Sequence, residues 1–285
     1  MPNSQRPAYT FRPMTSADLG SAHALSVQLK WPHRLEDWAM LQRVSQGFVA
    51  QDDGRLIGTA FTCAQGGYAT IGLVIVSDEY QGQGIGRALM ELAIEACGSK
   101  IPMLNATLAG APLYASQGFV DFGHIQQHQG HVRVPAVPAL PAQERCRELT
   151  DADRRQQIEL ANAGSGLDRH TVLNDLFDST EHAVGIERDG QLRGFALLRS
   201  FGRGRYIGPV VAENPEQAKH LIAVLLAQAP DAFLRMDIPS GCGLGPWLEE
   251  AGLKQVDTVA QMARGIPPQA SGGVHQFALV TQAIG

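Results

Sequence analysis

The sequence predicts a mixed α/β fold, built on a mixed sheet and repeated twice in tandem. Three observations predict it. Apolar runs of strand length alternate with runs that have helical periodicity. A length of 285 residues suits two domains of ordinary size, and 44% hydrophobic residues allow each to bury a core. Short motifs also recur across a proline-rich segment near the middle of the chain.

The first copy opens with a short strand at 9–13 and two helices. Thr15 is a suitable N-cap for the first helix, and residues 35–44 form the second. Strands at 48–50 and 56–64 flank the turn Gln51-Asp-Asp-Gly54. The run 69–76 is almost wholly apolar, which predicts a strand in the interior of the sheet.

A second amphipathic stretch follows, and it predicts a helix at 84–97. Its apolar positions follow the spacing of one buried stripe: Ile85, Ala88, Leu89, Leu92, Ala93 and Ala96. A strand at 103–107, a short helix at 112–117 and a last strand at 120–127 complete the copy.

The second half repeats these elements. The matching pairs of segments are 15–18 with 150–153, 53–58 with 189–194, 71–76 with 207–212, and 114–119 with 248–253. The offset between partners stays between 134 and 136 residues. The intervening stretch Val134-Pro-Ala-Val-Pro-Ala-Leu-Pro141 favours an extended, semi-rigid path. We therefore predict domains at 1–133 and 144–285, joined by a linker at 134–143.

Composition excludes several classes of function. Residues 1–135 hold 9 basic and 10 acidic side chains, and residues 136–285 hold 14 and 18, so neither half has the positive charge of a nucleic-acid or polybasic membrane binder. The four cysteines, Cys63, Cys97, Cys146 and Cys242, show neither disulfide nor zinc spacing. Residues 1–7 lack the apolar core of a signal peptide, and the longest apolar run, 221–227, is too short to span a bilayer. We expect a cytoplasmic protein with reduced thiols.

The most informative segment joins the apolar strand to the helix at 84–97. It reads Gln81-Gly-Gln-Gly-Ile-Gly86. Glycines let the backbone approach a ligand closely, and a helix start offers unpaired N–H groups, so the segment suits a pyrophosphate. A dinucleotide fingerprint fails because its third glycine would fall on Arg87, and the Gly-Lys-Ser/Thr of a P-loop is absent.

The remaining pattern, Q-x-x-G-x-G after a strand, resembles the coenzyme A loop of the GNAT N-acetyltransferase superfamily. A second motif, Tyr114-x-x-x-Gly118-Phe119, is also typical of that family. The resemblance covers residues 9–125 well. It reaches residues 145–265 only through the repeat.

The resemblance implies acetyl-CoA as co-substrate and a role for each matching residue. Backbone N–H groups of Val74, Ile75 and Val76 would face the acetyl carbonyl and the pantetheine arm. The pyrophosphate would lie on Gln81, Gly82, Gln83, Gly84, Ile85, Gly86 and Arg87. Tyr114 would be the general acid that protonates the departing sulfur, and Asn105 would contact the pantetheine arm or a water. Asp78 stands where relatives often carry proline, a change that matters little to contacts made by the backbone.

The general base is not assigned. His33, Glu36 and Asp37 lie in the segment that forms one wall of the acceptor site in such proteins, and we expect all three to be solvated surface residues. His124, His128 and His131 do not meet the geometry of a shared metal site on one strand, so we expect no metal.

The second copy has lost the family's functional residues. Its loop equivalent reads Gln217-Ala-Lys-His-Leu-Ile222, without glycines, Glu216 sits at the helix start, and Leu248 replaces Tyr114. We expect this copy to pair with the first or to shape the acceptor site. Arg199, Arg203 and Arg205 are candidates for holding an anionic group, although a solvated turn is the favoured interpretation. We interpret Cys242 as a loop residue.

The resulting hypothesis is an N-acetyltransferase that acetylates a primary amine of a small molecule, in preference to a protein amine. The net charge of −5 favours a cationic or neutral acceptor. Two alternatives remain: a non-catalytic acetyl-CoA sensor that binds a partner, and a structural scaffold. We expect a monomer whose two copies form a pseudo-dimer, or a homodimer, without nucleic acid or membrane partners.

Overall fold

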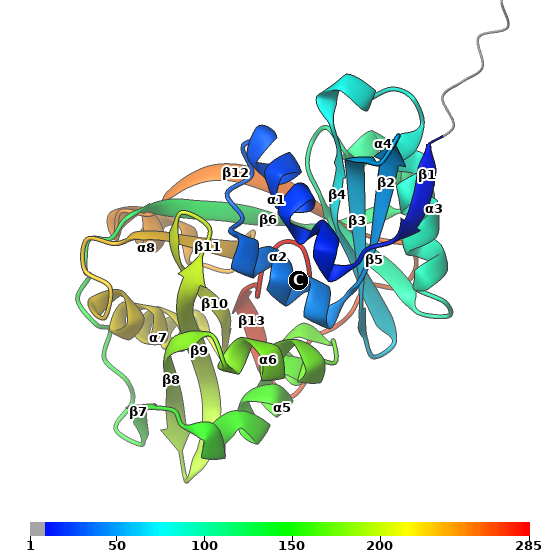
Figure 1. Ribbon diagram of the computed structural model, residues 1–285. Coiled ribbons are helices and arrows are strands. Elements are labelled where there is room, and N and C mark those ends of the chain that lie inside the picture. The colour runs from blue at the N-terminus through cyan, green and yellow to red at the C-terminus, as the bar shows by residue number, and fades with distance from the viewer. Residues whose placement is uncertain (1–8) are drawn as a thin grey trace, which may run out of the picture.

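The structure is a computed structural model that describes residues 9–285 (Figure 1). The expectation that no signal peptide is present concerns residues 1–7, which lie outside the described residues. None of the helices within residues 9–285 is both long and apolar enough to cross a membrane.

The first copy follows the predicted order of elements. Its elements are β1 (Thr10–Pro13), η1 (Ser16–Asp18), α1 (Leu19–Gln28), α2 (Leu35–Val44), β2 (Gln46–Asp52), β3 (Arg55–Gln65), β4 (Tyr68–Val76), η2 (Asp78–Tyr80), α3 (Ile85–Ala96), β5 (Ile101–Ala106), α4 (Ala111–Ala115) and β6 (Val120–His131). The strand predicted at 120–127 is too short, because β6 continues to His131 along a partner strand of the second copy.

The second copy repeats the series without a counterpart of η2 and adds one strand. Its elements are β7 (Glu144–Glu148), η3 (Asp151–Asp153), α5 (Arg154–Ser165), α6 (His170–Phe177), β8 (Thr180–Arg188), β9 (Gln191–Phe201), β10 (Gly204–Ala212), α7 (Pro215–Ala227), β11 (Phe233–Pro239), α8 (Gly245–Glu250), β12 (Lys254–Ala263) and β13 (His275–Ala278). The additional strand is β13.

The same helix start appears in both copies. The Thr15 N–H donates to the Asp18 carboxylate at 2.8 Å, and the Thr150 N–H donates to Asp153 at 2.8 Å. An arginine from the preceding strand pairs with each carboxylate at 2.7 Å, Arg12 in the first copy and Arg147 in the second. The hydrogen bonds from Arg12 hold the pKa of Asp18 well below its usual range, and those from Arg147 lower the pKa of Asp153 in the same way. The recurrence of this Thr–Asp–Arg arrangement supports the predicted duplication.

The hairpin between β2 and β3 turns on Asp53 and Gly54, with φ of 45° and 81°. Asp189 and Gly190 repeat these values in the second copy. Positive φ at both residues is the requirement of a tight two-residue hairpin, which explains the recurring Asp-Gly pair. The turn is two residues long instead of the four predicted, because β2 and β3 extend further toward each other.

The two copies exchange their last long strands. The sheet runs β1-β2-β3-β4-β5-β12-β6-β11-β10-β9-β8-β7, and β13 pairs with β10. Strand β12 of the second copy therefore lies between β5 and β6, and β6 of the first copy lies between β12 and β11. Figure 1 shows β6 and β12 crossing together between the two halves. The domain boundaries at 133 and 144 stay a prediction. The exchanged strands show in addition that each copy completes its part of the sheet with a strand of the other.

The helices bury three main cores against the sheet. Helix α3 covers the first copy and includes the buried residues Ile85, Leu89 and Ala93 of the predicted stripe. Helix α7 covers the second copy. A third core lies between the copies, where Trp38 of α2 and Leu173 of α6 are both fully buried. This shared core fixes how the copies sit together.

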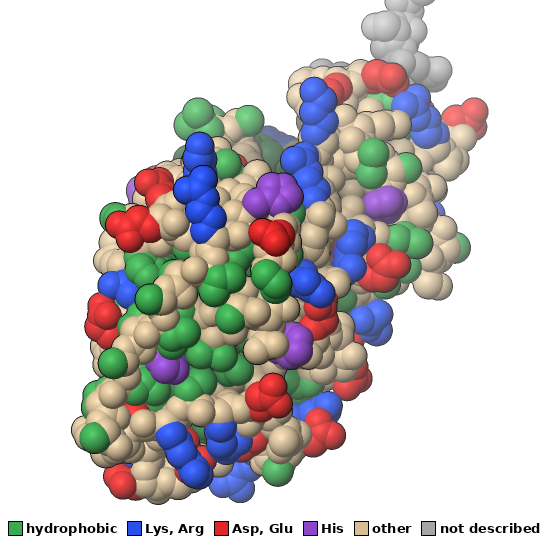
Figure 2. Space-filling view, turned by 90° about the vertical axis from the view of Figure 1, so that its left-hand side faces the viewer, with side chains coloured by type: hydrophobic (Ala, Val, Ile, Leu, Met, Phe, Trp, Pro, Cys, Tyr) green, Lys and Arg blue, Asp and Glu red, His purple; other side chains and the backbone are tan. Residues whose placement is uncertain are grey.

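Figure 2 shows acidic and basic side chains interspersed over the face formed largely by the second copy. No extended basic area is visible on that face. The picture agrees with the charge balance of this half in the sequence.

The strand exchange predicts that the halves stay together when the linker is cut. A protease site inserted within residues 134–141 and then cleaved should give two fragments that elute as one species and unfold in one cooperative transition. The physical reason is that β5 and β6 both pair with β12, and β6 also pairs with β11. Size-exclusion chromatography and thermal unfolding measure this. Fragments that separate without denaturant would contradict it.

Candidate functional site

The site begins where β4 parts from β5. The two strands pair in parallel only from Tyr68 to Ile71 on β4. At this point β4 carries a bulge against β3, and Leu73 has a positive φ of 49°. The buried Thr59 hydroxyl donates to the Leu73 carbonyl at 2.8 Å and holds the bulge. Beyond Ile71 the edge of β4 that faces away from β3 has no strand partner among residues 9–285, so its N–H groups are open to a ligand.

The glycine loop lies at the end of the same strand. Gly82 and Gly84 have φ of 75° and 86°, and Gly84 is the N-cap of α3. A Cβ at either position would meet no atom within 4 Å, so both residues border open space. The Gln81 side chain donates to the Val76 carbonyl at 3.2 Å and to Asp78 at 2.8 Å. Asp78, the departure from the family pattern, therefore helps to orient Gln81.

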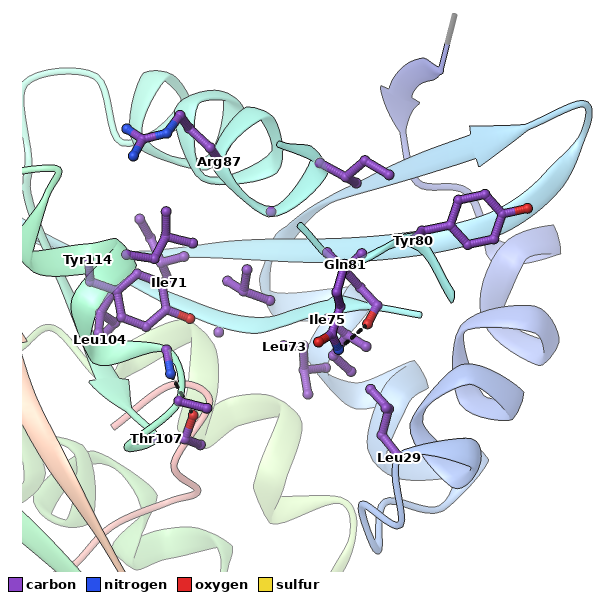
Figure 3. A pocket seen from close by; sticks show the side chains of 18 of the residues that line it. Leu29, Ile71, Leu73, Ile75, Tyr80, Gln81, Arg87, Leu104, Thr107 and Tyr114 are labelled. Carbon is purple, nitrogen blue, oxygen red and sulfur yellow. Dashed lines mark hydrogen bonds between the residues drawn. The ribbon is translucent and has the colours of Figure 1, made fainter. Parts of the chain in front are cut away.

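Strand, loop and helix start enclose a cleft of about 730 Å³, called here the main cleft (Figure 3). It contains all but one of the predicted cofactor-binding and catalytic residues: Val74, Ile75, Val76, Gln81, Gly82, Gly84, Ile85, Gly86, Arg87, Asn105 and Tyr114. The exception is Gln83, whose side chain accepts a hydrogen bond from Tyr9 outside the cleft lining. The structure thus brings the predicted residues together.

Tyr114 is held on α4 against Phe119 and Gly110, and only 9% of it is exposed. Its hydroxyl points toward the middle of the cleft (Figure 3). Burial raises the pKa of Tyr114 to about 12, because the interior disfavours the phenolate. None of the hydrogen bonds found within residues 9–285 uses this hydroxyl, so its proton is available to a ligand.

A second, smaller cavity, called here the side cavity, adjoins the main cleft. Its volume is about 260 Å³. Five residues line both spaces: Trp31, Gly72, Leu73, Asn105 and Thr107. The other walls come from the α1–α2 connection, from β6 and from the second copy, including residues 281–283.

Residues 281–283 were not recognised as part of the site from the sequence. The Asn105 amide donates to the Gln282 carbonyl at 2.8 Å. A Cβ at Gly72 would lie 2.4 Å from the Ala283 carbonyl oxygen, so this glycine is required for the close approach. The two contacts set the segment beside the bulge of β4. No motif in the sequence signals it.

The candidate bases are placed differently from the expectation. His33 is not a solvated residue: it lines the side cavity, and burial lowers its pKa to about 4. Asp37 is buried and accepts hydrogen bonds from Arg34 and from the Gly202 N–H of the second copy. Asp37 therefore forms a contact between the two copies. Glu36 is exposed, as expected. The expectation failed because the second copy covers this segment.

Contrary to the interpretation favoured from the sequence, the three arginines near residue 200 do not all lie in a solvated turn. Arg199 is buried, donates to the Val280 carbonyl at 2.6 Å and lies over the Tyr206 ring. Arg205 pairs with Glu181 at 2.7 Å. Arg203 is exposed and lines the side cavity.

The remaining candidates for chemistry have structural places. His128 is buried and His131 is exposed, and each shares a hydrogen bond with a backbone carbonyl, that of Leu253 and that of Asp231. Within residues 9–285 no three histidine, cysteine or acidic side chains are grouped to hold a metal. Cys242 lies in the loop between β11 and α8.

The second copy has the same parting of strands, but its own chain fills it. Strand β10 pairs with β11 only at Arg205 and Tyr206 and then bulges at Gly208–Pro209. Strand β13 pairs with the far part of β10, and the Leu279 N–H donates to the Asp237 carbonyl of β11 at 2.9 Å. The space that forms the main cleft in the first copy is therefore occupied.

Three further differences separate the second copy from the first at this place. Pro209 stands at the position of Leu73 and has no N–H. Only two residues, Glu213 and the cap Asn214, separate the end of β10 from the start of α7, so the long glycine loop is missing. Leu248, in place of Tyr114, is fully buried in the core.

Comparisons with known proteins agree with this geometry. Models of the acetyltransferase (GNAT) domain match residues 43–121 and residues 158–277. The chain is 32% identical to the uncharacterized N-acetyltransferase YitH of Bacillus subtilis (strain 168) over 228 residues, 77% of this chain and 78% of that one.

Solved structures show the same fold. A putative acetyltransferase from Pyrococcus horikoshii superposes with a TM-score of 0.80 at 19% identity, covering 100% of this chain and 99% of that chain. A tandem GNAT protein from the clavulanic acid biosynthesis pathway superposes with a TM-score of 0.63 at 16% identity, covering 91% and 99%.

The buried phenol predicts a specific dependence of stability on pH. Tyr114 has a folded-state pKa of about 12 against an ordinary value of 10.0, so its contribution is complete below pH 10 and is lost as pH rises toward 12. Between pH 9 and pH 11.5, the wild type should lose about 2 kcal/mol more unfolding free energy than Tyr114→Phe. Denaturant unfolding at both pH values measures the difference. Parallel losses in the two proteins would show that the phenol is not desolvated.

Proposed function

Because the chain belongs to the GNAT family of acetyltransferases and carries two such domains in tandem, we propose that its first copy transfers an acetyl group from acetyl-CoA to a primary amine of a small molecule. The observation that supports this most is the main cleft. It joins the open edge of β4, the glycine loop and the Tyr114 hydroxyl in one space. The second copy, whose equivalent space is filled by β13, takes no cofactor in this proposal.

The first copy offers a different group to each part of acetyl-CoA. The pyrophosphate would bind the N–H groups of Gly82 to Gly86 and the N-terminus of α3, where the helix dipole favours negative charge. The pantetheine arm would follow the open edge of Val74, Ile75 and Val76. The acetyl carbonyl would then lie near the bulge at Leu73, and Asn105 near the arm.

The reaction follows from these positions. The neutral amine attacks the thioester carbon, a C–N bond forms, the C–S bond breaks, and the amine loses one proton to water or a base that is not assigned here. Backbone N–H groups at the bulge stabilise the negative charge on the carbonyl oxygen. The Tyr114 hydroxyl donates its proton toward the departing sulfur, in the role of general acid.

The raised pKa of Tyr114 bears on this role. A phenol with a pKa of about 12 stays protonated at pH 7, so the donor is always ready. Complete transfer to a thiolate of pKa about 8.5 is uphill by roughly 5 kcal/mol. Tyr114 would therefore act as general acid by partial transfer of its proton to the sulfur while the C–S bond breaks, and solvent would complete the protonation of the released thiolate.

The size of the side cavity supports a small acceptor. Its volume of about 260 Å³ is below the roughly 300–1,000 Å³ of pockets for drug-sized ligands. It opens on the main cleft at Leu73 and Asn105, where the thioester would lie. A compact amine fits this space better than a folded protein surface. The shared core supports a monomer in which the two copies form the pseudo-dimer.

Acetyl-CoA binding should depend on the charge and shape of the glycine loop. In Gly84→Glu, a carboxylate at a position with positive φ would face the pyrophosphate, so calorimetric binding of acetyl-CoA should weaken at least 100-fold. Gly54→Glu is the matched control, because Gly54 has φ of 81°, equally open surroundings and a place on the β2–β3 hairpin turn. Equal binding by wild type and Gly84→Glu would contradict the proposed cofactor site.

Turnover separates an enzyme from a sensor. Thiol release from acetyl-CoA over a panel of amines should occur, and Tyr114→Phe should lower kcat by roughly 10²–10⁴-fold with little change in acetyl-CoA affinity. Tyr68→Phe, a tyrosine on β4 outside the main cleft, serves as the control and should keep kcat. Binding without thiol release from any amine would favour the sensor. An unchanged kcat in Tyr114→Phe would remove the assigned role.

A further inference from the structure

We propose that the side cavity binds an amine that carries an anionic group, and that Arg203 of the second copy is the residue that recognises this group. The proposal rests on the proposed acetyl transfer and names the class of acceptor. It follows from the position, the charge and the construction of the cavity.

The cavity lies between the copies and is built by both. His33, on the α1–α2 connection, and Gln129, on β6, come from the first copy. Arg203, on the β9–β10 turn, Arg235, on β11, and Gln282 come from the second. The second copy therefore contributes to acceptor binding although its own cofactor space is filled.

The cationic groups of the cavity differ in how far they are neutralised. Arg235 is nearly buried and pairs with the fully buried Asp237 at 2.9 Å, so its charge is already balanced. Arg203 has no ion pair or hydrogen bond with any residue in the range 9–285. It is exposed at the cavity lining, and this leaves its planar guanidinium free to bind a carboxylate or a phosphate through two hydrogen bonds.

The other ionisable groups of the lining leave a positive balance. Lys30 adds one more cation at the same cavity. Asp257 is the one carboxylate among the described lining residues, and it is exposed and accepts a hydrogen bond from the Thr258 N–H. His33 adds no charge at pH 7, because burial holds its pKa near 4. Counting the Arg235–Asp237 pair as neutral, Lys30 and Arg203 face one acid.

A positive cavity also suits the chemistry. An amine attacks only as the free base, and neighbouring cations lower the pKa of an ammonium group. Attraction between an anionic group elsewhere on the acceptor and the cations of the cavity would offset the unfavourable free energy of placing an amine in positive surroundings. The local charge is opposite to the overall charge of −5, from which the sequence favoured a cationic or neutral acceptor. The charges of the lining lie nearer to the bound acceptor than the rest of the surface does. They therefore determine which charge on the acceptor is favoured.

The test compares matched acceptors on two proteins. Thiol release is measured with several α- and ω-amino acids and with the carboxamide of each, on wild type and on Arg203→Gln. The wild type should prefer the carboxylates after correction for free amine. Arg203→Gln should lower kcat/KM for the carboxylates by about 10- to 100-fold and for the carboxamides less than threefold. Arg155→Gln, which makes the same charge change on an exposed face of α5, should alter neither series.

Each outcome separates this inference from the proposed function. Turnover with equal rates for both series, or a preference that Arg203→Gln leaves intact, overturns the inference while the acetyltransferase stands. If acetyl-CoA binds but no amine releases thiol, calorimetric binding of the same amines to the acetyl-CoA complex decides. Carboxylates that bind more tightly than carboxamides, by a margin that Arg203→Gln removes, support the inference. Equal binding overturns it.

Discussion

The structure depends on one departure from regular pairing, the separation of β4 from β5 after Ile71. The bulge at Leu73 carries backbone strain, with a positive φ in a residue other than glycine, and the buried Thr59 hydroxyl holds it. The separation leaves main-chain N–H groups open in a fold that otherwise pairs its strands. After the separation, the chain continues from β4 through η2 to the glycine loop and α3. The open strand edge and the main cleft are therefore consequences of the same local geometry.

The duplicated fold uses this separation in two ways. In the first copy it is an open cleft. In the second copy β13 enters it, and the following residues reach across to Gly72 and Asn105. In the second copy the space equivalent to the main cleft is thus filled, and residues 281–283 form a wall of the side cavity. The exchanged strands β6 and β12 and the shared core around Trp38 hold that wall in place.

Local features were predictable from the sequence, and features that join distant segments were not. The helix 35–44 and the convergence of Tyr114 with the glycine loop follow from periodicity and from motifs. The strand exchange leaves no such signal, because β6 has the same alternation whether it pairs with β5 or with β12. His33 and Asp37 were expected in solvent, since their covering residues lie more than 160 positions away, as Gly202 does.

The most direct test of the central claim is amide hydrogen exchange with and without acetyl-CoA. If the open edge of β4 and the glycine loop bind the cofactor, the amides of residues 73–76 and 82–86 should exchange more slowly when acetyl-CoA is added. The amides of the equivalent edge of β10, residues 210–212, should not change. Unchanged exchange at both segments of the first copy, or protection that appears in the second copy instead, would contradict the account.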